Sequence, residues 1–211
     1  MKLYYAETFN PRRACAVARY LESPVDYVRV DLARGEHRQP PYLALNPNGK
    51  VPLLVDGELH LWEADAIMVH LATLAGSDLW PTVPTLQVEV LRWLSWNQAH
   101  FLRHGGALYF EHLIKPWLGL GEPDAAAVAE AEKFFRHFAA VLDAHLAKRE
   151  WLVGDRLGVA DFAVSTPLGW AKEARLPLEG FEHLARWHRQ LQAMPAWREP
   201  FPSTTAVGAA A

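Results

Sequence analysis

The stretch NPNGKVPLLVDGELHLWEADAIMVHLA (46–72) says most about how this chain folds. Its middle, VPLLVDGELHLW (51–62), holds two β-prone runs around Asp56-Gly57. That dipeptide is favoured in tight two-residue turns, so the segment predicts a β-hairpin. The residues from 63 to 74 that follow have the apolar period of a helix. A hairpin leading directly into a helix is therefore the nucleus of the expected fold.

The residues ahead of this nucleus extend the same pattern. LYYA (3–6) is an apolar run typical of a buried strand, and CAVARYL (15–21) has a helical pattern opened by Pro11. Residues 25–32 alternate apolar and polar side chains as a strand does. With a short turn-rich segment at 40–49, the predicted order is β-α-β-α-β-β-α. This order describes a small mixed sheet with helices.

Beyond Gly76 the character of the sequence changes. The prolines within 77–85 mark a linker, because each residue before a proline is pushed out of the helical region. Residues 86–200 have helical periods throughout, and residues 201–211 form a small, alanine-rich tail. The helical region is expected to break at Gly105-Gly106 and to continue from 159 to 174 despite a proline. The fold class is α/β for residues 1–76, followed by an all-α domain.

Composition sets the broad class. The chain has 211 residues, 51% of them hydrophobic, and a formal net charge of −3, which suits a folded core and gives no electrostatic footprint for nucleic acid. Arg12, Arg13 and Arg19 are the nearest approach to a basic patch, as a solvated helix face or an anion site. The single cysteine, Cys15, excludes an intrachain disulfide. Without a signal peptide or a long apolar run, the protein is expected to be soluble and cytosolic.

Two short segments could bind a ligand through the backbone or a carboxylate. If the Val51-Pro52 bond is cis, the Val51 N–H and C=O are free to pair with an extended ligand, although most X-Pro bonds are trans. Glu63 and Asp65 stand just ahead of an apolar helix. They either complement the helix dipole or, through Glu63, meet the ammonium of an amino-acid head.

The order and spacing of these pieces resemble the glutathione transferase superfamily. Residues 46–72 are similar to the family pattern NPxGxVPxLxDxxxxLxESxAIxxYLA, and WLVGDRLGVADFAV (151–164) resembles its second signature. GEHRQPPYLALNP (35–47) matches the loop ahead of the first motif. The resemblance covers roughly residues 1–200 and implies a thioredoxin-like N-terminal domain followed by an all-helical domain.

The same resemblance implies a glutathione site. It implies a cis bond at Val51-Pro52, pairing of the Val51 backbone with the cysteinyl part of glutathione, and a γ-glutamyl head held by Glu63 and Ala64. Lys50 and His37 match loop positions that reach the glycine carboxylate, although His37 could equally be a solvated loop histidine.

Two positions depart from the family pattern. Ala64 replaces the usual Ser, so a hydroxyl for the γ-glutamyl carboxylate is missing, while the Ala64 N–H can still donate. Weaker glutathione binding is the expected result. Gly158 replaces the usual Ser or Thr cap of the second signature, where Asp161 can still reach back to its N–H.

The turn YYAETFNPRR (4–13) supplies the candidates for contact with the glutathione sulfur. Its Thr-x-Asn pattern resembles the turn of the bacterial nu-class transferases and of a fungal nitrogen regulator, in which Thr and Asn contact the sulfur and disulfide reduction is prominent. Thr8 and Asn10 can donate an O–H and an N–H to a thiolate. Asn10 could instead cap the helix at Pro11. Cys15 lies too far into the helix and is expected to be buried.

A second substrate would bind against the helical domain. Trp96, His100, His104 and Tyr109 cluster near the glycine pair, as pocket lining or as core packing. The His100 and His104 pair lacks a third ligand at recognisable spacing except His112, so no metal site is expected.

The sequence predicts an enzyme that activates the glutathione thiol for an electrophile or for disulfide reduction. Glutathione is a cosubstrate and no other cofactor is implied. The resemblance implies a homodimer without nucleic-acid or membrane partners. The alternative is a non-catalytic binding or regulatory protein of the same fold, favoured by Ala64. A glutathione-dependent isomerase or dehalogenase would differ only in the second pocket.

Overall fold

The computed structural model describes residues 1–202, which fold into two compact units. Among the described residues, the first unit contains Met1–Ser77 together with residues 194–202, and the second contains Asp78–Ala193. Residues 203–211, most of the expected tail, lie outside the described part. Within residues 1–202 no helix is long and apolar enough to cross a membrane.

Within the described residues, the first unit has one four-stranded sheet with the strand order β2-β1-β3-β4. The strands are β1 (Lys2–Tyr5), β2 (Asp26–Arg29), β3 (Leu53–Asp56) and β4 (Leu59–Trp62). β1 runs parallel to β2 and antiparallel to β3. In the β3–β4 hairpin Asp56 pairs with Leu59, so the turn is Gly57-Glu58, one residue later than predicted. Gly57 has φ +58°, which glycine adopts without steric cost.

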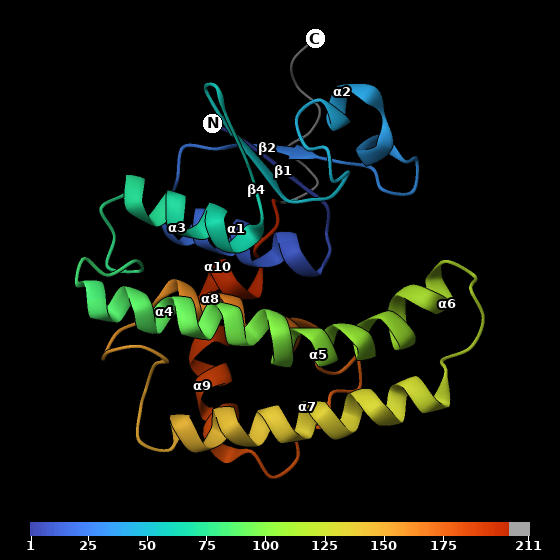
Figure 1. The fold of residues 1–211 in the computed structure, drawn as a ribbon, viewed down its shortest axis with the longest axis vertical. Helices are drawn as coiled ribbons and strands as arrows, with labels where there is room; N and C mark the ends of the chain where they lie inside the picture. Colours follow the sequence, from blue (N-terminus) through green and yellow to red (C-terminus); the bar gives the residue numbers. More distant parts are fainter. Residues whose placement is uncertain (203–211) are drawn as a thin grey trace. The chain divides into compact units, whose positions relative to one another are not determined.

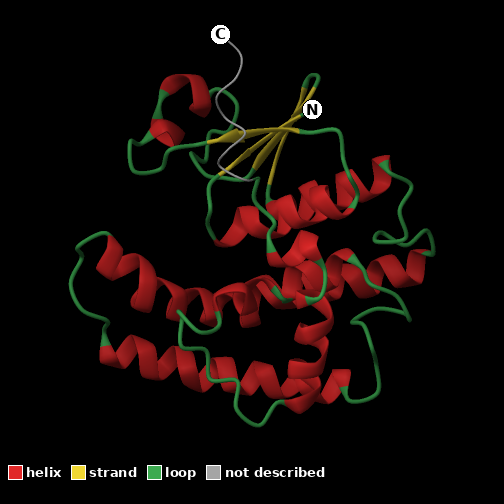
Figure 2. Cartoon of the chain, turned by 180° about the vertical axis from the view of Figure 1, so that it is seen from behind, coloured by secondary structure: helices red, strands yellow, loops and turns green. Residues whose placement is uncertain are grey.

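Helices cover both faces of this sheet. They are α1 (Phe9–Tyr20), α2 (Pro40–Leu43), α3 (Ala64–Leu74) and α10 (Pro195–Arg198), with a 3-10 turn at Glu36–Arg38. α1 and α3 lie side by side on one face, and α2 lies on the other (Figures 1 and 2). The predicted order of strands and helices is confirmed. Cys15 is fully buried in α1, as expected.

The two arginines that follow Pro11 are buried, so the solvated helix face, one of the two interpretations of them, is wrong. Arg12 is 8% exposed and Arg13 is 1% exposed. The Arg12 Nη2 donates to the Trp197 carbonyl at 2.7 Å, and its guanidinium lies 4.7 Å from the centre of the Trp197 ring. Burial lowers the pKa of Arg12 to about 10. Arg12 thus joins α1 to α10, where the chain returns to the first unit.

The second unit is helical. Its helices are α4 (Pro84–Trp96), α5 (Leu102–Tyr109), α6 (Lys115–Trp117), α7 (Ala125–Leu146), α8 (Val159–Val164) and α9 (Glu182–Gln192). Wider π-helical turns at Asn97–Phe101 and Phe110–Ile114 join α4, α5 and α6 into one rod that runs beside α7 (Figure 1). Asp124 caps α7 by accepting from the N–H groups of Ala126 and Ala127.

The predicted break at Gly105-Gly106 is wrong, because α5 continues through both glycines. A Cβ on Gly105 would lie 2.8 Å from Cβ of Pro167 and 3.3 Å from the ring of Phe135. The glycine is needed for close packing within the unit and not for a bend. The regular α-helical hydrogen bonding of the rod is interrupted instead at the two π-helical turns, which the sequence pattern did not predict.

The predicted helix at 159–174 is also wrong in its second half. α8 ends at Val164, and a 3-10 helix covers Thr166–Trp170, because Pro167 has no N–H to continue the α-helical ladder. The start of α8 is as expected, since Asp161 accepts from the Gly158 N–H at 2.9 Å. Asp161 also accepts from the Leu152 N–H and from the Trp187 Nε1–H.

Candidate functional site

Four of the predicted site residues meet at one cavity of the first unit. The cavity has a volume of about 470 Å³ and is lined by Thr8, Leu32, His37, Arg38, Leu43, Asn48, Gly49, Lys50 and Val51. Its size is within the usual range for small-molecule pockets. The lining comes from the start of α1, from the segment before α2 and α2 itself, and from the loop ahead of β3, and it combines three basic side chains with a hydroxyl.

The loop ahead of β3 is held by buried polar contacts. The Lys50 carbonyl accepts from the Tyr42 hydroxyl at 2.6 Å and from Asn46 Nδ2 at 2.7 Å. Asn46, which is 1% exposed, also accepts from the N–H of Asn48. Burial raises the pKa of Tyr42 to about 12, so this hydroxyl remains a donor. The contacts fix the direction in which the chain enters Val51.

Val51 presents its backbone beside the cavity. The Val51-Pro52 peptide bond is cis, as the resemblance implies. Val51 precedes β3, and among the described residues its N–H and C=O have no backbone partner. Pro52 is buried behind it. Gly49 has φ +57°, and a Cβ there would lie 3.1 Å from the His37 carbonyl oxygen, so only glycine fits this turn easily.

His37 stands on the 3-10 turn that borders the cavity. Burial, with a smaller contribution from Arg38, lowers its pKa. A lowered pKa keeps the imidazole neutral at neutral pH, where it can still donate one N–H. Lys50 and Arg38 are the other two basic side chains of this lining.

Thr8 is the N-cap residue of α1 and is half-buried at the cavity wall. Its side chain makes no capping hydrogen bond to the helix, so capping of α1 does not occupy the hydroxyl. The helix begins at Phe9, two residues before Pro11, which places Asn10 inside the first turn. The alternative in which Asn10 caps the helix is therefore wrong.

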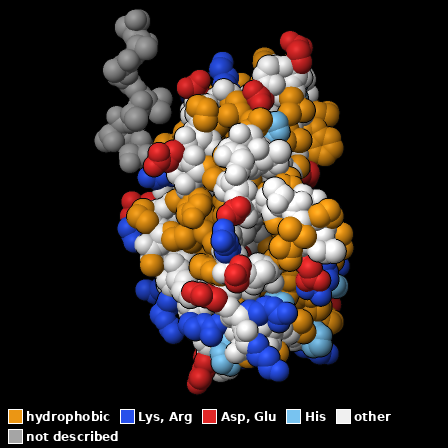
Figure 3. All heavy atoms as spheres, turned by 90° about the vertical axis from the view of Figure 1, so that its left-hand side faces the viewer, with side chains coloured by type: hydrophobic (Ala, Val, Ile, Leu, Met, Phe, Trp, Pro, Cys, Tyr) orange, Lys and Arg blue, Asp and Glu red, His pale blue; other side chains and the backbone are white. Residues whose placement is uncertain are grey.

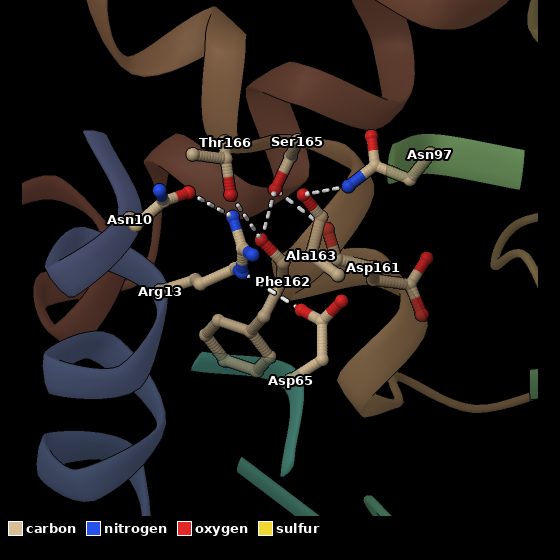
Figure 4. Close-up of polar contacts among 9 residues, drawn as sticks. All are labelled: Asn10, Arg13, Asp65, Asn97, Asp161, Phe162, Ala163, Ser165 and Thr166. Carbon is tan, nitrogen blue, oxygen red and sulfur yellow. Dashed lines mark hydrogen bonds and ion pairs between the residues drawn. The ribbon is translucent and has the colours of Figure 1, made fainter. Parts of the chain in front are cut away.

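Asn10 is held by a buried arginine (Figure 4). The Arg13 Nη1 donates to Asn10 Oδ1 at 3.0 Å, and the Arg13 Nε pairs with Asp65 Oδ1 at 2.8 Å. Because arginine can only donate, the oxygen of the Asn10 amide must be the atom that faces Arg13. The Asn10 NH₂ group then points away from the arginine.

Glu63 and Ala64 begin α3, away from the lining of the 470 Å³ cavity. Glu63 has φ +71°, an uncommon conformation for a residue with a side chain, and its carboxylate does not cap the helix. The side chain of Ala64 is 2% exposed. As the first residue of α3, Ala64 has an N–H without an intrahelical partner, as every helix start does.

The predicted second-substrate residues lie among aromatic rings of the second unit. His100 stacks on Phe138 with ring centres 4.5 Å apart, and His104 stacks on Phe134 at 5.0 Å. Trp96 stacks on Phe101, and Tyr109 lies against Trp170. The structure thus brings Trp96, His100 and His104 together at the α7 interface and places Tyr109 on another neighbour. Their role in a pocket stays a prediction.

Within residues 1–202 no group of three His, Cys, Asp or Glu side chains is placed to hold a metal ion. The sequence pattern identified neither the cavity-lining residues Arg38 and Asn48 nor the buried pairing of Arg13 with Asp65. The first two could have been suspected from their position beside His37 and Lys50. Arg13 and Asp65 could not, because an arginine and an acidic residue at helix starts are usually solvated.

Comparison with known protein families identifies the family to which the chain belongs. The family model "Glutathione S-transferase, N-terminal domain" matches residues 1–73, and "Glutathione S-transferase, C-terminal domain" matches residues 98–195. The thioredoxin-like unit, the helical unit and these matches together show that the chain belongs to the glutathione S-transferase family.

Individual relatives agree. Glutathione S-transferase 3 of Zea mays is 40% identical over 185 residues, covering 82% of this chain and 80% of the relative. Glutathione S-transferase GstB of Escherichia coli K12 is 34% identical over 194 residues, covering 90% and 91%. A solved glutathione S-transferase I from maize, in complex with an atrazine glutathione conjugate, has a TM-score of 0.86 at 28% identity and covers 94% of this chain and 95% of its own.

Proposed function

We propose that this glutathione transferase binds glutathione in the first unit and activates its thiol through Thr8 and Asn10. The Thr8 O–H and the Asn10 N–H donate to the sulfur and favour thiolate over thiol. The observation that carries the proposal is the cavity whose lining includes Thr8, Val51 and the basic residues Lys50 and His37.

Each part of glutathione has a chemical match. The unpaired backbone of Val51 suits the cysteinyl amide in an extended conformation. Lys50, with Arg38 and His37 beside it, suits the glycine carboxylate. Glu63 suits the ammonium of the γ-glutamyl head, and the Ala64 N–H at the helix start suits its carboxylate.

The chemistry that follows is nucleophilic attack by sulfur. The thiol proton passes to solvent, and the thiolate donates an electron pair to an electrophilic carbon, forming a C–S bond while any leaving group departs with its own electron pair. Against a disulfide, the same thiolate forms a new S–S bond and expels the other sulfur as thiolate. The Thr-x-Asn resemblance to the nu-class turn favours including disulfide reduction.

A second candidate is a binding or regulatory protein with the same fold. Ala64 is the observation that favours it, because the missing hydroxyl removes one hydrogen bond to the γ-glutamyl carboxylate and so weakens glutathione binding. In that case glutathione would bind weakly or not at all, and no turnover would be found.

The proposal includes a homodimer, a cytoplasmic location and no cofactor besides glutathione as cosubstrate. Support for the dimer comes from large apolar side chains at the surface. In the first unit, Leu59 and Trp62 on the edge strand β4 are 42% and 43% exposed, and in the second unit Val88 and Leu91 on α4 are 64% and 51% exposed. Figure 3 shows hydrophobic side chains among charged ones on one face of the molecule. A second copy of the chain is the partner that such surfaces would fit.

The test is calorimetric titration with glutathione and, separately, with glutathione disulfide, followed by turnover assays with an electrophilic aromatic halide and with a small disulfide. Binding of glutathione with turnover in either assay is the expected result. Tighter binding of the disulfide, with faster disulfide turnover, would assign reduction as the main reaction. Absence of heat at millimolar ligand would overturn the proposal and favour the regulatory protein.

A further inference from the structure

A buried ionic contact connects the two helix starts of the proposed glutathione site. Arg13 of α1 is 1% exposed, its Nε pairs with Asp65 of α3 and its Nη1 donates to Asn10. Figure 4 shows the guanidinium between the Asn10 amide and the Asp65 carboxylate. The three side chains form a continuous chain from the start of α3 to the turn that carries Thr8.

We infer that Arg13, held by Asp65, is a positioning residue that orients the Asn10 amide so that its NH₂ group faces the glutathione sulfur. The inference rests on the proposed function, because it assigns how one of the sulfur contacts is held. It adds two residues to the site, and neither of them touches glutathione.

We call Arg13 and Asp65 together the Asn10 clamp. Asn10 needs this clamp because an amide side chain can present either its oxygen or its NH₂ group to the same neighbour. Asn10 is exposed, and the terminal torsion of an asparagine is broad and roughly two-fold. A half-turn about it would replace the NH₂ donor with an oxygen, whose lone pairs repel a thiolate. The arginine removes this alternative, because its N–H groups require the oxygen on their own side.

The clamp also strengthens the donor. A hydrogen bond from a charged guanidinium to the amide oxygen polarises the amide, and hydrogen bonds in a chain reinforce one another. Asp65 holds the guanidinium in place through its negative charge, since Arg13 Nε lies 2.8 Å from Asp65 Oδ1. Since Asp65 directly follows Ala64, the carboxylate of the clamp stands next to the proposed γ-glutamyl site.

A merely structural role, in which Arg13 only ties α1 to α3, predicts different behaviour. The test compares Arg13→Lys, Asn10→Ala and the double variant with the unchanged protein. A lysine can pair with Asp65 but cannot hold both partners in the fixed geometry of the guanidinium. Arg12→Lys is the matched control, since Arg12 is also buried in α1 but contacts Trp197 of α10.

The readouts are glutathione affinity and the pH midpoint for thiolate formation, taken from the absorbance of the bound thiolate and from the pH dependence of kcat/KM. In Arg13→Lys the midpoint should rise by about 1, a tenfold lower thiolate-to-thiol ratio, with less change in affinity. Asn10→Ala should raise it similarly, and the double variant should add nothing further. Arg12→Lys should leave the midpoint unchanged, even where it lowers the melting temperature.

An unchanged midpoint in a folded Arg13→Lys protein, or additive effects in the double variant, would overturn the inference. Where Arg13→Lys does not fold, Asp65→Asn replaces it, because the amide keeps an acceptor for Arg13 while removing the charge; a rise in its midpoint is expected and an unchanged midpoint counts against the clamp. If the unchanged protein itself binds no glutathione, the proposed function fails, and that result is separate from any effect of the variants.

Discussion

Ala64 places an N–H group but no hydroxyl at the start of α3. The side chain is buried, at 2% exposure. Glu63, which precedes it, is held at φ +71° with its carboxylate free of the helix. At the scale of single residues, the proposed head site therefore depends on one carboxylate and one backbone donor.

Restoring the hydroxyl tests this dependence. Ala64→Ser should tighten glutathione binding by roughly tenfold, because a hydrogen bond to a charged group contributes about 1.5–3 kcal/mol and part of that is lost in fitting the side chain. Calorimetry gives the change. Ala66→Ser, on an exposed position of the same helix, is the control and should bind as the unchanged protein does. Equal affinities for the two variants would remove Ala64 from the site.

Thr8 allows a second test at the same scale. Thr8→Val keeps the shape of the side chain and removes the O–H, so kcat/KM should fall by about ten- to a hundredfold. Thr8→Ser keeps the hydroxyl and should retain most of the activity. Steady-state kinetics with the halide substrate provide the measurement. A Thr8→Val protein as active as Thr8→Ser would show that the hydroxyl does not act on the sulfur.

The resemblance to the glutathione transferases selected those candidate residues whose role depends on local position. Thr8 follows a strand, and Val51 precedes a proline at the start of another; spacing alone left other interpretations open, and the family motifs favoured a role in the site. The contact between Arg13 and Asp65 was not predicted, because it forms only where two helices pack together. Neither segment alone indicates which oppositely charged residue will pair with it. Their pairing is a property of the packed unit.

Among the secondary-structure elements, α5 shows that a glycine pair does not always mark the end of a helix. Gly105 lies inside the helix against Pro167, and the proline ring cannot move aside as a flexible side chain would. A glycine pair suggests a break because glycine disfavours helices, yet the cost relative to alanine is only about 1 kcal/mol per residue. Tertiary packing outweighs it here.

Gly105→Ala should therefore destabilise the protein although alanine is the better helix former. A Cβ 2.8 Å from Pro167 Cβ requires the helix to shift, at a cost of about 1–3 kcal/mol that exceeds the gain in helix propensity. Denaturant unfolding measures the difference. Gly106→Ala, at the half-buried neighbouring position, is the comparison and should cost less. A stabilised Gly105→Ala protein would contradict the packing explanation.

Asp161 at the start of α8 predicts a pH effect on stability. Burial raises its pKa to about 7, although three N–H groups donate to the carboxylate. The folded state therefore holds the proton more tightly than the unfolded state, where the pKa is near that of an ordinary Asp. Stability from this group is complete below about pH 4 and is lost as the pH rises through about 7.

Melting temperatures measured between pH 5 and pH 8 test this effect. Asp161→Asn cannot ionise, so its melting temperature should decline less over this range than that of the unchanged protein, although it starts lower because the amide cannot accept all three hydrogen bonds. Asp155→Asn, an exposed neighbour, should decline as the unchanged protein does. Parallel declines in all three proteins would assign the pH dependence to other groups.

At the scale of the whole molecule, the exposed apolar residues of β4 and α4 predict self-association. Light scattering should give twice the 23.8 kDa mass of one chain. Trp62→Glu and Leu91→Glu place a charge on these surfaces and should each shift the mass toward one chain. Val141→Glu is the control, because Val141 is similarly exposed, at 43%, on α7. A monomeric unchanged protein would contradict the prediction.

The return of the chain to its first unit also affects how the protein is made. Residues 1–77 leave the ribosome before the helical unit, but α10, with the Arg12–Trp197 contact, belongs to the same unit as residues 1–77 and is synthesised only after the whole helical unit. Domains generally fold as units in the order in which they emerge. Here the N-terminal unit cannot acquire its last packed layer until residues near 197 have been translated. Its completion is postponed until α10 has been made, and a nascent chain stalled before Met194 would expose the face of α1 that contacts α10.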